Sequence, residues 1–307
     1  MGFLVTFKAV AEIIFICIFG YLIVKKKILS SESMEIFSKF IIDVTLPCFI
    51  ISNFIQGFNW SNLFQVLFFP VYALVIIFAG GLLGYLLSIS FKVKKEIRGV
   101  TAGISAIGNY GYLPMALVVA ILPSSEASEA LIDIFFFIAI GNLLTWSWGM
   151  YLITHKKKKF RPGIPFYAAL LGLAIGGSPA KEYIPHLILE PLSQIGKITI
   201  PLALFTLGGI LATFSWKDKE LSKKSISISL LVKLFILPLI VWGVLKFIPL
   251  AKIPKMVVII EAASPPAVAL SLIATRYKSN TSLVSASLFI AYIISIFTLP
   301  LFLAISM

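Results

Sequence analysis

Inside one apolar stretch of this sequence, residues 108–114 read GNYGYLP, and inside a second apolar stretch residues 262–267 read AASPPA. Proline lacks a backbone N–H and clashes with the preceding helical turn, while glycine lets the backbone leave helical geometry. In a membrane, such an interruption persists only where protein or a water-filled cavity satisfies the freed backbone groups. The two motifs therefore predict a pair of discontinuous helices that meet at a binding site. Two ordinary proline kinks are the alternative interpretation.

The composition of the whole chain agrees with a membrane setting. Of its 307 residues, 59% are hydrophobic and 13% are charged, and the mean hydropathy is +1.02. A soluble domain is about half apolar and about a quarter charged, so a water-soluble globular protein is excluded. The sequence predicts an all-α polytopic membrane protein with ten transmembrane helices. The ten expected spans are residues 4–24, 34–55, 63–91, 99–122, 130–153, 164–177, 193–214, 226–247, 255–275 and 282–305.

The lysine and arginine residues indicate how these spans are oriented. The net charge is +13, and 18 Lys or Arg residues fall in the odd-numbered loops whereas 4 fall in the even-numbered loops. Cytoplasmic loops carry the excess of basic residues, so both termini are expected outside the cytoplasm, in a plasma-membrane protein. Orientation and attraction to anionic lipid account for the basic charge, and nucleic acid is not expected as a partner.

A weak internal repeat divides the chain. Thr45-Leu46-Pro47 in the second span matches Thr199-Ile200-Pro201 in the seventh, 154 residues further on. Because five is an odd number, successive five-helix units must lie in opposite orientations in the membrane. The sequence predicts a first inverted repeat over residues 1–154, a basic cytoplasmic linker over 155–163 and a second inverted repeat over 164–307.

The predicted interruptions also suggest what would bind there. Helix N-termini carry unpaired N–H groups and a positive dipole end, which favour an anion such as a carboxylate. Asn109 and Ser264 could each donate and accept hydrogen bonds, and no arginine lies inside a predicted span to clamp a carboxylate. The candidate binding residues are Asn109, Tyr110, Gly111, Pro114, Ser264, Pro265 and Pro266.

Ionisable residues inside spans are costly and are candidates for coupling or gating. Glu261 precedes the ninth-helix motif and could carry a proton coupled to substrate movement, or line an outer vestibule. Lys233 is expected near the depth of Asp43, and the two could form a gate that closes in one transport state. The alternatives are a permanent structural pair, or a Lys233 side chain that extends its ammonium group to the membrane–water interface. No metal-ligand spacing or catalytic arrangement occurs, so neither a metal, a cofactor nor an enzymatic activity is expected.

The motifs resemble those of the auxin efflux carrier family, and more distantly the bile acid/sodium symporters. The resemblance rests on NYGYLP at 109–114, on ASPPAV at 263–268, on ATRY at 274–277 and on TLP at 298–300. It implies two inverted five-helix repeats whose fourth and ninth helices cross in a mobile transport domain. It also implies a scaffold of the first two helices of each repeat, homodimers, and an elevator mechanism.

The resemblance further implies organic anions as substrates, such as indole acetate in plants and di- or tricarboxylates in bacteria. By position, the crossover role would be inherited by Asn109, Pro114, Pro265 and Pro266. The chain departs from plant members in that residues 63–91 contain no carboxylate or lysine, so a charged support site sometimes found in that helix is missing.

The leading interpretation is a secondary transporter of small organic carboxylates. Its coupling stays open between H⁺, carried by Glu261, and Na⁺, held by Asn109 and backbone carbonyls, and uniport is also compatible. A cation antiporter of similar crossed-helix fold would need carboxylates at the crossing, and the fourth-helix motif has none. A membrane enzyme would need clustered Asp or His side chains, whereas the acidic residues inside spans are scattered. A passive channel remains a further alternative.

Overall fold

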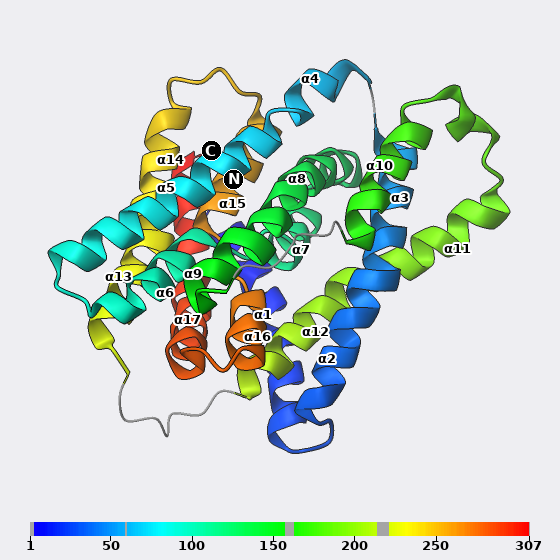
Figure 1. Cartoon of the computed structure of the whole chain (residues 1–307). Helices are drawn as coiled ribbons and strands as arrows, with labels where there is room; N and C mark the ends of the chain where they lie inside the picture. Colours follow the sequence, from blue (N-terminus) through cyan, green and yellow to red (C-terminus); the bar gives the residue numbers. More distant parts are fainter. Residues whose placement is uncertain (1–2, 59, 157–162, 214–220, 307) are drawn as a thin grey trace.

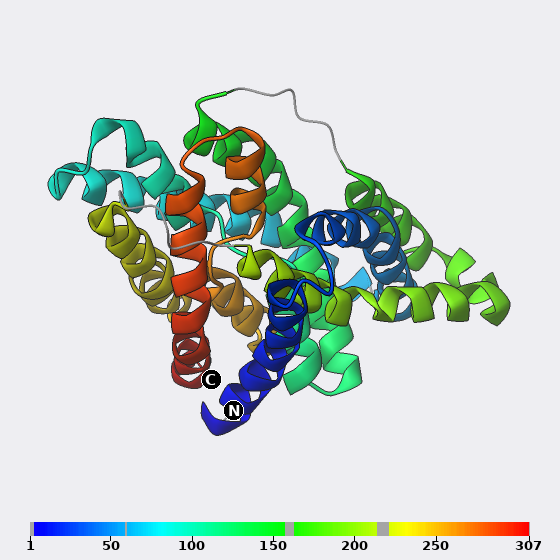
Figure 2. The same cartoon turned by 90° about the horizontal axis from the view of Figure 1, so that it is seen from below.

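The computed structural model describes residues 3–58, 60–156, 163–213 and 221–306, and all regular structure in this part of the chain is helical (Figure 1). The predicted basic linker 155–163 lies largely outside the described residues. Figures 1 and 2 both show that the start of the first helix and the end of the last helix lie close together, on the same side of the helical bundle.

Six of the ten expected spans correspond to helices that are long and apolar enough to cross a membrane. In two of these six, a π-helical turn continues the helix. The six are α1 (Phe3–Lys25); α4 (Leu63–Val66) with α5 (Phe69–Ser90); α8 (Ser124–Leu144), η3 (Thr145–Gly149) and α9 (Met150–Thr154); α11 (His186–Lys197) with α12 (Thr199–Ala212); α13 (Lys223–Leu231), η5 (Val232–Ile236) and α14 (Leu237–Leu245); and α17 (Thr281–Ser306).

The other four expected spans correspond to shorter or segmented helices. Two of them contain the motifs at 108–114 and 262–267, and in both cases one helix ends and another begins within or beside the motif. The four are α2 (Ser31–Phe40), η1 (Ile41–Thr45) and α3 (Leu46–Gly57); α6 (Lys95–Ala106) and α7 (Tyr112–Ile121); α10 (Ile164–Gly176); and α15 (Lys252–Ala263) and α16 (Ala269–Arg276).

The largest difference at a predicted boundary is about two turns. The seventh span was expected to begin at residue 193, but α11 begins at His186 and contains Pro191. The first turns of α11 mix polar and apolar residues, and a proline normally removes an internal helical hydrogen bond, so this stretch has neither the uniform hydropathy nor the residue types used to find spans.

The helices pack into two groups, and this division places the candidate site. In the first group, α1 packs against α12, while α3 packs against α10 and α11. In the second group, α5 packs against α6 and α8, and α15 packs against α14 and α17. The groups meet where α3 contacts α8 and where α1 contacts α7 and α17.

Glycine permits the closest helix contacts within the first group. A Cβ atom added to Gly208 of α12 would lie 1.8 Å from the backbone oxygen of Cys17 in α1, and one added to Gly20 would lie 1.9 Å from the backbone oxygen of Phe205. A Cβ on Gly176 of α10 would likewise lie 2.2 Å from the Phe54 oxygen in α3. These backbones touch directly, as is common between membrane helices with small residues at their interface.

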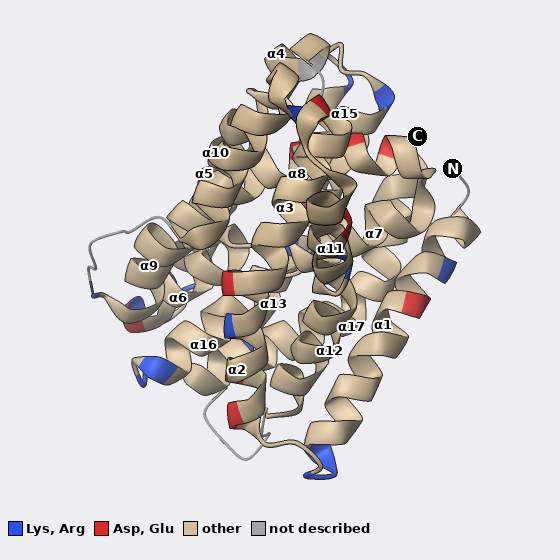
Figure 3. Ribbon diagram, turned by 90° about the vertical axis from the view of Figure 1, so that its right-hand side faces the viewer, with Lys and Arg blue, Asp and Glu red and all other residues tan. Residues whose placement is uncertain are grey.

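The outer surface is unusually apolar. Large hydrophobic side chains such as Phe64, Leu187 and Phe247 are 79%, 85% and 89% exposed. Figure 3 shows how sparse the charged residues are over the ribbon. Monomeric soluble proteins rarely expose large contiguous apolar patches, whereas the lipid of a bilayer would cover such side chains.

Candidate functional site

Two non-helical segments, residues 107–111 between α6 and α7 and residues 264–268 between α15 and α16, pair with each other. We call them the paired segments. Gly108 and Pro266 form an antiparallel bridge, in which the Asn109 N–H donates to the Pro265 oxygen at 2.7 Å and the Ala267 N–H donates to the Ile107 oxygen at 3.0 Å. Backbone groups that proline and glycine release from the helices therefore find partners across the two halves of the chain.

The pairing brings two helix N-termini to one place. α7 begins at Tyr112 and α16 begins at Ala269, immediately after the paired segments. Within the described part of the chain, the N–H groups of Tyr112, Leu113, Val268 and Ala269 donate no hydrogen bond. Such unpaired N–H groups and the positive ends of the two helix dipoles form an environment that favours negative charge.

A cavity of about 670 Å³ opens beside these N-termini. From the second helix group it is lined by the paired segments and by α7, α8, η3 and α16. From the first group it is lined by Ile42, Leu46 and Ile50 of η1 and α3, and by residues of α10. The cavity thus lies between the two groups, and every lining residue that the structure describes is uncharged.

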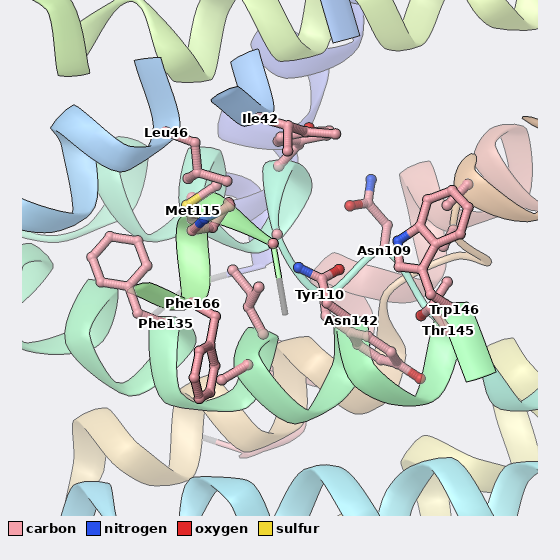
Figure 4. Close-up of a pocket in the computed structure, with 18 of the residues that line it drawn as sticks. Ile42, Leu46, Asn109, Tyr110, Met115, Phe135, Asn142, Thr145, Trp146 and Phe166 are labelled. Carbon is pink, nitrogen blue, oxygen red and sulfur yellow. The ribbon is translucent and has the colours of Figure 1, made fainter. Parts of the chain in front are cut away.

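The polar and apolar parts of this lining are separated (Figure 4). In this view Asn109, Asn142 and Trp146 lie toward one end of the cavity, and the rings of Phe135 and Phe166 lie toward the other. An anion at the polar end would meet amide donors and helix N-termini, and an attached apolar body would meet aromatic rings.

Asn109 is held in place by a residue that the sequence analysis missed. Its Nδ2 donates to the Tyr292 hydroxyl of α17 at 2.8 Å, and the Asn109 side chain is 6% exposed. Asn142 of α8 also lines the cavity and was not predicted. Asn142 is a polar residue inside the apolar stretch 130–153, a signal that could have marked it, whereas Tyr292 becomes part of the site only through helix packing between segments distant in the chain.

Of the remaining predicted binding residues, two line the cavity and four do not. Tyr110 and Gly111 line the cavity. Pro265 and Pro266 form the paired segments, but they do not line the cavity. Ser264 does not line the cavity either, and its hydroxyl donates to the Ile260 oxygen of the preceding helix, α15, at 2.7 Å. The list is completed by Pro114, which is buried in the first turn of α7.

The three predicted coupling residues do not all come together. Lys233 and Glu261 are both fully buried and interact electrostatically with each other. Asp43 lies in η1, which packs against α2, α3, α10 and α12, and it forms no ion pair with Lys233 in the described structure. In this conformation the proposed gate between Lys233 and Asp43 is not closed.

Comparison with known proteins places this chain in a family. The model of the family described as "Membrane transport protein" matches residues 5–164 and again residues 162–303. An uncharacterized transporter of Methanocaldococcus jannaschii is 22% identical over 97% of this chain and 98% of its own length. One of Methanothermobacter thermautotrophicus is 23% identical over 98% of both chains. Protein PIN-LIKES 7 of Arabidopsis thaliana is 24% identical over 62% of this chain and 51% of its own length.

Proposed function

Because this chain belongs to the auxin efflux carrier family of membrane transport proteins, we propose that it carries small organic carboxylate anions across the cell membrane by secondary active transport, as an exporter or exchanger. It is a multi-pass membrane transporter and not an enzyme. The observation that carries the proposal is the opening of two helix N-termini, with unpaired N–H groups, onto one cavity whose described lining is uncharged.

The lining of the cavity supports an anion over a cation. A cation antiporter would need carboxylates at the site, and none of the cavity-lining residues that the structure describes is acidic. Among the described residues no lysine or arginine lines the cavity either, so the two helix dipoles and the amides of Asn109 and Asn142 would hold the negative charge. This modest positive potential suits one carboxylate better than two or three, and the aromatic end suits an apolar substrate body.

A thermal-shift screen of the purified protein tests the substrate class. We expect a monocarboxylate with an apolar body to raise the melting temperature, because a ligand that binds the folded state stabilises it by mass action. The matched amide or methyl ester of the same acid is the control and should give a smaller shift, since it lacks the charge. An equal shift with acid and amide, or no shift with any carboxylate, would contradict the proposal.

The cavity position also supports alternating access. We propose that the first helix group forms a scaffold, that the second moves against it as an elevator, and that two copies associate through the scaffold. A cavity lined by both groups, with the paired segments on the second, fits a site that moves with one group. We further propose ten spans in two inverted repeats, residues 1–154 and 164–307, joined by the basic linker 155–163, with both termini outside the cytoplasm.

Glu261 is the candidate proton carrier of this cycle. Its carboxyl group is fully buried, and neither oxygen has a hydrogen-bond partner within the described residues. We expect Glu261→Gln to flatten the pH dependence of transport in proteoliposomes, because an amide of nearly the same shape cannot exchange a proton. The control is Glu12→Gln, which changes an exposed carboxyl of α1 and should leave the pH profile intact. A pH profile of Glu261→Gln that matches the wild type would reject the proton-carrier role.

A further inference from the structure

The buried side chain of Lys233 in η5 reaches the paired segments. The Nζ of Lys233 donates to the Ala262 oxygen at 3.3 Å and lies 5.4 Å from the centroid of the Tyr110 ring. A Cβ atom added to Gly108 would lie 2.7 Å from the same Nζ. The ammonium group therefore contacts the last turn of α15 and the segment that follows α6, one from each half of the chain.

The backbone around Lys233 explains how its side chain reaches this position. Lys233 belongs to η5, a π-helical turn in which the Leu237 N–H bonds to the Val232 oxygen, and Pro238 follows. Because Pro238 has no N–H to donate, the Leu234 oxygen loses its usual helical partner, and the helix widens locally. Single π-helical turns of this kind are frequent at functional sites.

Two helix C-termini near Lys233 favour a positive charge on its amino group. α15 ends at Ala263 and α6 ends at Ala106, and helix C-termini carry the negative end of the dipole. In transporters with discontinuous helices, such C-terminal ends and unwound carbonyls commonly coordinate the coupling Na⁺ or H⁺. Here the Nζ of Lys233 donates to one of these carbonyls, and an ionised carboxylate at Glu261 would favour the ammonium form of Lys233.

We propose that Lys233 is a tethered cation that occupies the coupling-ion position at the paired segments, so that neither the fold nor substrate binding requires Na⁺. A metal cation placed beside the ammonium would be repelled by it, and the Ala262 carbonyl that could otherwise coordinate Na⁺ already accepts from Lys233. The inference rests on the proposed function in one respect, namely that the cavity next to Lys233 binds the substrate.

The first test needs no substrate. The melting temperature of the purified wild-type protein is measured as NaCl replaces choline chloride at constant ionic strength and pH. We expect the two salts to agree within about 2 °C, because no Na⁺ binds the folded state specifically. A larger rise with Na⁺ overturns the inference. This result is independent of whether any carboxylate binds, so it separates failure of the inference from failure of the proposed function.

The second test removes the tethered cation. In Lys233→Ala, n-propylammonium can replace the missing part of the side chain. We expect propylammonium to raise the melting temperature of this variant by about 2 °C or more above its effect on the wild type, with 1-propanol giving no such gain. Lys197→Ala, which removes an exposed lysine at the end of α11, is the charge-matched control. Equal responses of Lys233→Ala and Lys197→Ala to propylammonium would overturn the inference, and the Na⁺ titration of the wild type decides the matter if Lys233→Ala does not fold.

Discussion

We expect Asn109→Ala to reach the membrane in normal amounts and to lose uptake or efflux of the substrate. The Asn109 amide lies in the cavity beside two helix N-termini, where it can bond directly to a carboxylate. A hydrogen bond to a charged group contributes about 1.5–3 kcal/mol, so its loss weakens binding by about 10–100-fold. Transport by the variant in proteoliposomes, normalised to the amount of inserted protein, measures the effect.

Two further variants separate this role from general damage to the fold. Asn53→Ala removes an amide of α3 that donates to the Phe49 oxygen of its own helix at 2.8 Å and does not line the cavity, so transport should stay near the wild-type rate. Tyr292→Phe removes the hydroxyl that accepts from Asn109, which frees the amide without deleting it, so an intermediate loss is expected. Wild-type rates for Asn109→Ala would refute the assignment of Asn109 to the site.

We expect Gly208→Ala to cause the largest loss of stability among single-methyl changes in the first helix group. The new Cβ would lie 1.8 Å from the Cys17 oxygen and 2.6 Å from its carbonyl carbon, both of which are backbone atoms of α1. Because no side-chain rotation can relieve this clash, α1 and α12 must move apart. Overpacking of this kind costs about 3 kcal/mol, and thermal unfolding in detergent should show a clear drop in melting temperature.

The matched control is another helical glycine. Gly243 lies in α14, and a Cβ added there has nothing within 4 Å. Gly243→Ala should therefore keep or slightly raise the melting temperature, since alanine is favoured over glycine in a helix by about 1 kcal/mol. If the two alanine variants unfolded at the same temperature, the close α1–α12 contact would not be a determinant of stability.

Some properties of the site follow from short stretches of the sequence. Residues 108–114 and 262–267 signal a change of backbone geometry through glycine and proline alone, and the structure has α7 begin at Tyr112 and α15 end at Ala263. Asn109 is likewise visible as a rare polar residue inside an apolar stretch. Such features depend on a few neighbouring residues, and can be found without knowing how the helices pack.

The partners of the charged residues could not be found in this way. Asp43 and Lys233 were paired by their expected depth in the membrane, but the side chain of a helical residue also has a direction around the helix axis. In a helix that is apolar on most faces, hydropathy does not reveal that direction. The π-helical turn at Val232–Ile236 changes it further, and the Lys233 amino group lies against Gly108 and the Ala262 oxygen.

The amino-acid sequence by itself therefore determined the membrane class, the approximate helical segments and the two places where the helices are interrupted, because hydropathy and backbone chemistry act over short stretches of chain. The tertiary structure alone decided that Tyr292 orients Asn109, that Asn142 completes the cavity lining and that Lys233 donates to the Ala262 oxygen. Each of these contacts joins residues of different helices, so it depends on how those helices are rotated and how closely they pack. Close glycine contacts, such as that of Gly208 with Cys17, set this packing.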